Sequence, residues 1–507
     1  MLITFTGVAG SGKTTQSLKY ALKLAKEEDI RIITLTNLGT SMVRERNDKL
    51  DVSTVHSFAF NIVREANNNV NIFDESDKEM YFHTTLRLNF IPNVRGFETY
   101  KLPEGNKIDL IKRKILNTFF RDVGELKINS VLNVIDSIKN DFGIELDSFQ
   151  IYKKIIEYEN YLRNNNFVDF DYMLLDAYKN VSYSKFNYEI LVWDEANDSM
   201  PIIVELINKI ASEKKFEYVI INGDPAQTIY DNLLFSKPEL FFNLFNKSDE
   251  KHILNKSKRL GKNIVDEIMK IYKKIPKNDR IAENIETDKD GGNVFKINYE
   301  KMLYILRNGR ELYNKDTAII TLSNSKAFEI GKILSKNCIP FSVIYEGKKF
   351  GWDYYSLAVR NFLYFCINKK FDENFIDYYL MVKEFLSPKL DIGNLEVYNE
   401  DIIRGKFGVF ENVVENIDFS KLNITKETIL RSLYLNFHIK KPIKIITTHS
   451  AKGLEYENVF AILEPTRHFI DEFVNNDIIN YYRRLVYVQM SRVLTNLFIV
   501  GDLNLLL

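Results

Sequence analysis

Short apolar runs recur along this chain and alternate with segments whose apolar residues repeat every three or four positions. In the first half, the runs that predict strands are 2–6, 31–35, 52–55, 189–193 and 218–222. In the second half they lie near 294–297, 317–321, 341–345, 443–447, 458–462 and 497–500. Strands that alternate with helices favour a parallel sheet covered on both faces. We therefore predict an α/β protein with two such sheets.

Two long segments between the predicted strands are helical. The helical periods are Ile108–Phe120, Val131–Ile138 and Phe149–Leu162 in the first segment, and Phe350–Ile367 and Phe375–Phe385 in the second. Each segment is interpreted as a mainly helical insertion into one core. The predicted division is 1–65 with 165–250 for the first core, 66–164 for its insertion, 251–345 with 440–507 for the second core, and 346–439 for a small second insertion.

Composition narrows the class of protein. A chain of 507 residues is too long for one core, and 45% hydrophobic with 27% charged residues is typical of a soluble protein. Two cysteines fit a reducing compartment and provide no zinc-ligand cluster. We see no membrane-spanning run and no signal peptide, so we expect a cytoplasmic protein without a membrane partner.

The net charge of zero, from 69 basic and 69 acidic residues, argues against a generally basic coat for nucleic acid but permits a local basic channel. Four clusters are candidates: Lys107–Lys114, Lys251–Lys262, Lys440–Lys444 and Arg483-Arg484. Each is either a solvated face or a track for phosphates, and a solvated face is the commoner case.

Residues 7–14 carry the most specific chemistry. They read Gly-Val-Ala-Gly-Ser-Gly-Lys-Thr, the pattern of a phosphate-binding loop, between a predicted strand and a predicted helix. Backbone N–H groups and the helix N-terminus bind phosphates in such loops. Lys13 is predicted to reach the β- and γ-phosphates of ATP, and the Thr14 hydroxyl to hold Mg²⁺. The predicted nucleotide-binding residues here are Gly10, Ser11, Gly12, Lys13, Thr14 and Thr15.

Two later strands end in further candidates for ATP hydrolysis. Asp194 and Glu195 follow an apolar strand, and we predict that Asp194 holds Mg²⁺ and Glu195 activates the attacking water. Gln227 follows the next strand and is a candidate sensor of the γ-phosphate or of that water, although a plain turn explains these residues equally well.

The order of these motifs resembles the UvrD/Rep/PcrA helicases of superfamily 1A. The matching segments are Thr34–Asn37 with Met42–Arg46, Thr54–Phe58, Asp169–Leu175, Asp194–Asp198, Gly223–Tyr230, Ser257–Arg259, Thr447–Glu455 and Arg483–Arg492. The resemblance implies two RecA-like domains with ATP between them. In that reading Arg259 and Arg492 come from the second domain and touch the γ-phosphate, with Arg492 as the arginine finger. Gly453 and Glu455 would bind the nucleotide, with Glu455 at the ribose.

The same resemblance implies a path for single-stranded DNA along residues Thr36, Asn37, Thr54, His56, Tyr230, Thr448 and His449. The implied activity is ATP-driven translocation on single-stranded DNA with 3′–5′ unwinding at junctions of single and double strands. Three alternatives stay open. One is a translocase subunit that unwinds poorly alone, another is a DNA-sensing ATPase switch in a repair, replication or defence complex with protein partners, and the last is an RNA helicase.

The sequence departs from the family pattern in several places. Met1 directly precedes the first strand, where the family usually has a segment that reads adenine, so we expect relaxed nucleotide selectivity. Tyr230-Asp231-Asn232 replaces the Tyr-x-Trp that stacks on a base. Either Tyr230, Phe58 or another aromatic residue substitutes for this tryptophan, or the grip on single strands is weaker. Asn197 replaces the usual glutamine, one methylene longer. The second insertion is shorter than in UvrD-like enzymes, so its regulatory role is not carried over.

Overall fold

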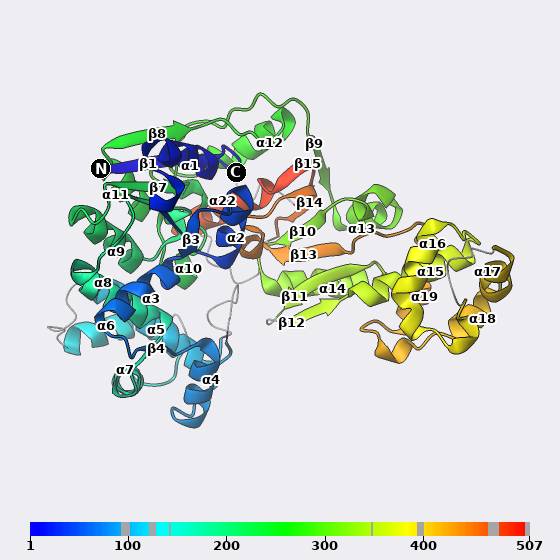
Figure 1. Cartoon of the computed structure of the whole chain (residues 1–507), viewed down its shortest axis with the longest axis horizontal. Coiled ribbons are helices and arrows are strands. Elements are labelled where there is room, and N and C mark those ends of the chain that lie inside the picture. Colours follow the sequence, from blue (N-terminus) through cyan, green and yellow to red (C-terminus); the bar gives the residue numbers. More distant parts are fainter. Residues whose placement is uncertain are drawn as a thin grey trace. The chain divides into compact units, whose positions relative to one another are not determined.

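The computed structural model describes residues 1–92, 102–120, 128–140, 143–345, 348–392, 400–464 and 476–501 (Figure 1). By packing, these residues form two units. Unit 1 holds the described residues of 1–291 and 476–491, and unit 2 holds those of 292–464 and 492–501. Each unit is built on one large sheet.

The sheet of unit 1 has six strands in the order β3-β2-β6-β7-β1-β8, and all neighbours are parallel. The strands are β1 (Leu2–Gly7), β2 (Ile30–Thr34), β3 (Asp51–Thr54), β6 (Ile190–Trp193), β7 (Tyr218–Gly223) and β8 (Glu250–Leu254). The helices are α1 (Lys13–Leu24), α2 (Asn37–Arg46), α3 (Val55–Ala66), α8 (Phe170–Asn180), α9 (Pro201–Ser212), α10 (Asp231–Leu234), α11 (Pro238–Lys247), α12 (Lys262–Tyr272) and α22 (Asn476–Met490). Such a sheet brings every loop that follows a strand to one edge.

Both faces of this sheet are buried, and alternate strand residues enter different cores. Ile32 and Val192 pack with α1 and α2 on one face, whereas Ile33 and Trp193 pack on the other with α3, α8 and α9. This explains why the strands read as continuous apolar runs rather than as alternating ones.

The insertion of unit 1 shares the second of these cores. Its helices are α4 (Glu75–Thr84), α5 (Glu104–Phe119), α6 (Ile128–Lys139) and α7 (Ser148–Asn164). Short strands β4 (Asn71–Ile72) and β5 (Phe167–Val168) pair where the insertion leaves and rejoins the core. Tyr81, Ile111 and Ile155 belong to the same buried cluster as Trp193 of the sheet. The insertion is therefore anchored to the core by shared apolar packing.

Unit 2 has a seven-stranded sheet in the order β12-β11-β13-β10-β14-β15-β9, parallel except for the β11–β12 pair. Its strands are β9 (Asn293–Ile297), β10 (Thr317–Thr321), β11 (Phe341–Tyr345), β12 (Lys348–Gly351), β13 (Ile443–Thr447), β14 (Tyr456–Ile462) and β15 (Val493–Val500). Its helices are α13 (Tyr299–Asn308), α14 (Asn324–Lys336), α15 (Tyr354–Ile367), α16 (Glu373–Val382), α17 (Glu400–Phe407), α18 (Phe410–Glu415), α19 (Lys426–Ser432) and α20 (Thr448–Ala451). Helices α15 to α19 form the small insertion (Figure 1).

The predicted α/β fold with two parallel sheets is confirmed, and every strand range predicted from the sequence overlaps a strand. Strand β8 was missed because its residues Glu-Lys-His-Ile-Leu alternate in burial at the sheet edge and lack an apolar run. The predicted helix from Phe350 begins only at Tyr354, because residues 348–351 pair with β11. Packing also separates the units after residue 291, later than the boundary after residue 250 that motif order predicts.

Candidate nucleotide and DNA site

The motifs of unit 1 converge on the carboxyl edge of its sheet. The loops after β1, β6, β7 and β8 carry the P-loop, Asp194 with Glu195, Gln227, and Arg259, respectively. The loops after β2 and β3 carry the residues matched to DNA-contacting motifs. One edge therefore holds both sets, as expected for ligand sites on parallel sheets.

The P-loop needs glycine at two positions. Gly10 and Gly12 have φ values of +72° and +84°, in the left-handed region that side chains disfavour. At Gly10 a Cβ atom would also lie 2.6 Å from the Cβ of Arg259. The backbone therefore turns at Gly12 so that α1 begins at Lys13, which directs the N–H groups of the first helical turn toward the loop.

Lys13 lies inside this loop. Its Nζ donates to the carbonyl oxygens of Gly7 at 2.9 Å and Val8 at 3.4 Å. Burial lowers the pKa of Lys13, while the nearby carboxylates of Asp224, Glu195 and Asp194 act in the opposite direction. A desolvated lysine amino group inside a phosphate-binding loop is suited to binding a polyphosphate.

Asp194 lies where a metal bound by Thr14 would need a second ligand. Thr14 Oγ1 donates to Asp194 Oδ2 at 2.9 Å, and Asn222 Nδ2 donates to Asp194 Oδ1 at 3.2 Å. Burial, followed by repulsion from Glu195, raises the pKa of Asp194 to about 6. A buried carboxylate beside a hydroxyl forms a pair of oxygen ligands of the kind that Mg²⁺ prefers. The residues present therefore fit an ATP–Mg²⁺ complex.

Asn197 connects the ends of β6 and β7. Its Oδ1 accepts from the N–H of Asp224 at 3.1 Å, and its carbonyl accepts from Thr228 Oγ1 at 3.1 Å. Gln227 Nε2 donates to Asp224 Oδ2 at 2.7 Å. Gln227 thus has a defined orientation, which a plain turn would not require. Glu195 precedes this segment with φ at +54°, a strained value for a residue other than glycine, at the position predicted for water activation.

The segment after β8 packs directly against the P-loop. Ser257 Oγ donates to the carbonyl of Ala9 at 2.8 Å, and the N–H of Lys258 donates to the carbonyl of Gly10 at 2.8 Å. Arg259 Nη1 donates to the carbonyl of Ser491 at 3.0 Å. The resemblance places Arg259 on the second domain, but the structure places it in unit 1 beside the P-loop. The pairing of β8 with β1 is the physical reason.

Sequence reasoning missed Lys258. Its Nζ lies 3.8 Å from the position that a Cβ at Gly12 would take, so a second ammonium borders the loop. The only signal in the sequence was its place beside Arg259 within one of the basic clusters.

Residues matched to DNA motifs in unit 1 lie at helix starts. Thr36 and Thr54 cap α2 and α3 by accepting from the N–H groups of Gly39 and Ser57, and both Thr36 and Asn37 are exposed. These side chains therefore fix where each helix begins. A residue at such a start also lies beside N–H groups that can bind a DNA phosphate.

Two candidates near the start of α3 make ring contacts within unit 1. The ring of His56 packs edge-on against Phe170 at 5.4 Å, and burial lowers the pKa of His56 to about 4, so this histidine is neutral at pH 7. Phe58 is only 3% exposed and stacks on Phe186. The hypothesis that Phe58 substitutes for the base-stacking tryptophan is therefore wrong, whereas the half-buried Tyr230 stays a candidate.

In unit 2, the candidate site residues lie at opposite ends of the strands: some precede a strand, and others follow one. Arg492 and the exposed Glu455 directly precede β15 and β14, and the N–H of Tyr456 donates to the carbonyl of Arg492 at 2.9 Å. Gly453 lies in the same turn, with φ at +84°. His449, which is half-buried, follows β13 at the opposite edge.

Thr448 does not present its side chain for DNA. It is fully buried, and its hydroxyl donates to the carbonyl of Thr321 at 3.2 Å. The predicted DNA contact by this side chain is therefore not supported. The hydroxyl instead fixes the start of α20 against β10.

Two of the predicted basic clusters, Arg483-Arg484 and Lys107–Lys114, each contain a buried residue that forms ion pairs. These two residues therefore belong neither to a solvated face nor to a track for phosphates. Arg484 is 3% exposed and contacts Asp231 at 2.5 Å and Asp279 at 2.6 Å. Lys112 is 2% exposed and contacts Asp109, Asp169 and Asp171. Sequence reasoning missed this because the acidic partners are distant in the chain, apart from Asp109.

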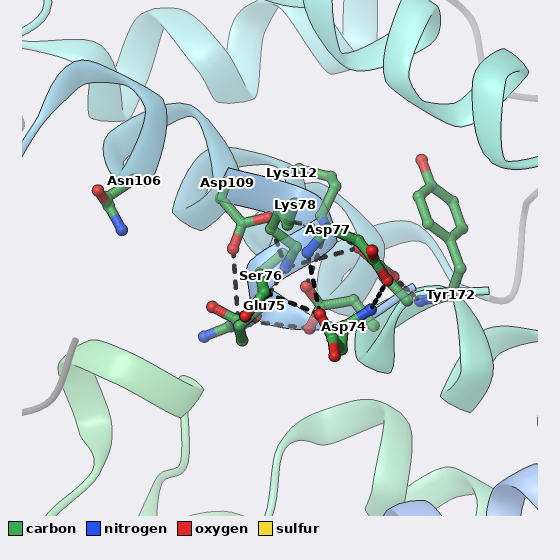
Figure 2. Close-up of polar contacts among 12 residues, drawn as sticks. Asp74, Glu75, Ser76, Asp77, Lys78, Asn106, Asp109, Lys112 and Tyr172 are labelled. Atoms are coloured by element: carbon green, nitrogen blue, oxygen red, sulfur yellow. Dashed lines mark hydrogen bonds and ion pairs between the residues drawn. The ribbon is translucent and has the colours of Figure 1, made fainter. Parts of the chain in front are cut away.

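The three carboxylates around Lys112 also have the spacing of a metal site, but a lysine occupies their centre. Lys112 Nζ lies 2.9 Å from Asp109 and 3.1 Å from Asp171, and it also contacts Asp169. Lys78 adds a second ammonium, and Figure 2 shows Lys78, Lys112 and Asp109 pointing toward one another. Burial alone would lower the pKa of Lys112, but the carboxylates raise it well above its ordinary value. This cluster is an ion-pair network and not a metal centre.

A P-loop, a paired Asp-Glu and a Gln at the carboxyl edge of a parallel sheet define a P-loop nucleoside triphosphatase. The family model of the UvrD/REP helicase N-terminal domain matches residues 3–241, and that of the UvrD-like helicase C-terminal domain matches residues 407–502. The chain belongs to the UvrD/Rep helicase family and is an ATP-hydrolysing DNA helicase.

One curated relative is the ATP-dependent DNA helicase Rep of Buchnera aphidicola subsp. Schizaphis graminum (strain Sg). It is 22% identical over 623 aligned positions, which cover 97% of this chain and 89% of the relative. The matched domains include every predicted site residue except Arg259. In the part of the chain that the structure describes, no helix is both long and apolar enough to cross a bilayer.

Proposed function

We propose that this helicase translocates on single-stranded DNA in the 3′–5′ direction and unwinds duplexes at junctions with single strands. The observation that carries this proposal is the shared edge of the unit 1 sheet. The loop after β2, which matches a DNA-contacting motif, follows the strand that pairs with β6, whose own loop carries Asp194 and Glu195; β3, whose loop matches the next DNA-contacting motif, pairs with the other side of β2. A change at the nucleotide can therefore move the DNA-contacting loops directly. We also propose that units 1 and 2 provide the two RecA-like cores.

In this proposal each residue of the ATP site has one task. Thr14 and Asp194 hold Mg²⁺, which neutralises phosphate charge when bound. Lys13 binds the terminal phosphates, and Glu195 accepts a proton from the attacking water. Gln227 orients that water or the γ-phosphate, and Arg492 neutralises charge that develops during phosphoryl transfer.

A second candidate function is an ATPase subunit or switch with little unwinding activity alone. It is favoured by the two aromatic candidates for base stacking, because Phe58 is buried and Tyr230, at the position of the stacking tryptophan segment, is half-buried. Stacking on an aromatic side chain is worth about 1–3 kcal/mol per base. A weaker grip on single strands would uncouple hydrolysis from strand separation.

Two measurements separate these functions. ATP hydrolysis is followed with and without single-stranded DNA or RNA, and unwinding is followed on duplexes with 3′ or 5′ tails. We expect stimulation by DNA and unwinding from 3′ tails. Stimulation without unwinding supports the second candidate, whereas unwinding only from 5′ tails contradicts the polarity. An absence of stimulation by either nucleic acid rules out the motor.

Replacing Arg492 with alanine should leave ATP binding intact and lower kcat by about 10³–10⁵-fold, the usual effect of losing an arginine finger. Nucleotide binding and DNA-stimulated phosphate release provide the two measurements. Arg431→Ala is the control, since Arg431 is 68% exposed and, among the residues that the structure describes, forms an ion pair with Glu427 on its own helix. Full turnover in Arg492→Ala would exclude the finger role.

The raised pKa of Asp194 predicts a pH-dependent affinity for Mg²⁺. A carboxyl group with a pKa of about 6 is ionised at pH 8 and becomes protonated as the pH falls through 6. A proton then competes with the metal, so affinity should fall by about tenfold per unit below pH 6 and be level above pH 7. Binding of a fluorescent nucleotide at graded Mg²⁺ measures this effect.

Asp194→Asn provides the reference for this pH series, because titration of the nucleotide itself persists in the variant. The proton-linked loss of Mg²⁺ affinity at position 194 should disappear in the variant. If wild type and variant show the same dependence on pH, Asp194 is not the titrating ligand.

A further inference from the structure

Helix α22 contributes a buried tyrosine to the nucleotide edge of unit 1. Tyr487 has no exposed surface, and its hydroxyl accepts from the N–H of Ala9 in the P-loop at 2.8 Å. The same hydroxyl donates to Asp224 Oδ2 at 3.3 Å. One phenol oxygen therefore links the loop after β1 to the loop after β7. Sequence reasoning assigned no role to this residue within the motif Arg483–Arg492.

Asp224 is the carboxylate that orients Gln227. Gln227 Nε2 donates to Asp224 Oδ2, the same oxygen that Tyr487 contacts, at 2.7 Å. The other oxygen accepts from the N–H of Ala226 at 3.1 Å. Burial lowers the pKa of Lys13, and the charge of Asp224 opposes this lowering more than that of Glu195 or Asp194 does. A continuous chain of hydrogen bonds thus runs from Ala9 through Tyr487 and Asp224 to Gln227.

The helix fixes the position of this hydroxyl from both sides. One turn before Tyr487, Arg484 donates to the carbonyl of Thr228 at 2.8 Å and pairs with Asp231 and Asp279. One turn after it, the carbonyl of Ser491 accepts from Arg259. The ring of Tyr487 also packs against Tyr272, with centroids 5.1 Å apart. Since buried side chains at this density have few alternative rotamers, the hydroxyl has one available place.

We propose that Tyr487 is a positioning residue that couples the P-loop to the γ-phosphate sensor Gln227, by bridging the Ala9 N–H and the Asp224 carboxylate. It does not contact the reacting atoms. It holds Asp224 at a fixed distance from the loop, so that Gln227 and the bound phosphates keep one mutual geometry. The proposal rests on the proposed role of Gln227 in the ATP site.

Tyr487→Phe tests the bridge, because it removes one oxygen and keeps the ring. The matched control is Tyr313→Phe in unit 2, which removes an equally buried hydroxyl that donates to the Leu306 carbonyl at 2.8 Å. We expect Tyr487→Phe to lower kcat for DNA-stimulated ATP hydrolysis by about tenfold with little change in KM, the loss of one hydrogen bond to a charged group. Tyr313→Phe should leave kcat and KM unchanged.

A second measurement does not depend on nucleotide. Hydrogen exchange in the nucleotide-free protein should be faster for the Ala9 amide in Tyr487→Phe than in wild type, and unchanged in Tyr313→Phe. Unchanged exchange, or a kcat within twofold of wild type, overturns the proposal. If Tyr487→Phe fails to fold, Asp224→Asn replaces it and should show the same selective loss of kcat.

Gln227→Ala distinguishes a failure of this proposal from a failure of the proposed site. If coupling through Asp224 is correct, Gln227→Ala and the double variant with Tyr487→Phe should have the same kcat, because residues that act as a unit are not additive. Wild-type kcat in Gln227→Ala overturns the role of Gln227 itself. A lowered kcat in Gln227→Ala with wild-type kcat in Tyr487→Phe overturns only the coupling.

Discussion

Replacing Lys13 with alanine should lower ATP hydrolysis by at least about 10²–10³-fold, the usual cost of removing one preorganised group that stabilises transition-state charge. Lys13 Nζ lies inside the P-loop against the Gly7 and Val8 carbonyls, where burial has already removed much of its hydration. Its interaction with phosphate therefore replaces contacts with backbone oxygens rather than with bulk water.

The measurement is phosphate release at saturating single-stranded DNA, together with calorimetric titration of nucleotide. The control is Lys19→Ala, since Lys19 lies on the exposed face of the same helix, α1. The control should hydrolyse ATP at the wild-type rate. A Lys13→Ala enzyme that keeps more than about a tenth of wild-type turnover would contradict the assignment of this loop.

Replacing Lys112 with methionine should lower the free energy of unfolding by about 3–5 kcal/mol, the usual cost of removing one partner from a buried ion pair. Lys112 contacts three buried carboxylates, and Asp169 among them is fully buried and caps α8. Without the ammonium, these carboxylates repel one another in a poorly solvated place. Lys78 and Arg113 remain near them but neutralise only part of the charge.

Denaturant unfolding, followed by a probe in the insertion of unit 1, measures this loss. Lys139→Met is the control: this lysine pairs with Asp136, which is 58% exposed, so we expect a change within about 0.5 kcal/mol. A double variant, Lys112→Met with Asp169→Asn, should regain part of the loss because it removes one uncompensated charge. Equal free energies of unfolding for Lys112→Met and the control would show that the ion-pair network around Lys112 does not contribute to stability.

The nucleotide site was predictable because its parts are local. A strand, a glycine-containing loop and a helix occupy about twenty contiguous residues, so the pattern at Gly7–Thr14 fixes their geometry without help from distant contacts. Asp194 and Gln227 were also found, because parallel strands bring their carboxyl ends to one edge whatever the loops between them contain.

Residues whose role depends on partners far along the chain were not predictable in the same way. Arg484 and Lys112 read as ordinary surface charges, because only the fold brings Asp231 and Asp169 to them. Phe58 could as well have been a stacking residue, and packing against Phe186 decides otherwise. Arg259 follows β8, an edge strand with little apolar signal, so its place beside the P-loop depends on the pairing of β8 with β1.

The sequence by itself therefore determined the class of the fold, the family and the chemistry of the phosphate site, since these depend on contiguous patterns and on the order of motifs. Tertiary structure alone decided which charges are buried, which aromatic rings are exposed enough to stack on bases, and which helix completes the nucleotide site. Tyr487 illustrates the difference, since it lies 478 residues from Ala9 in the chain and 2.8 Å from it in the fold. Such a contact leaves no periodic trace in the sequence, because only the folded unit 1 brings helix α22 to the loops after β1 and β7.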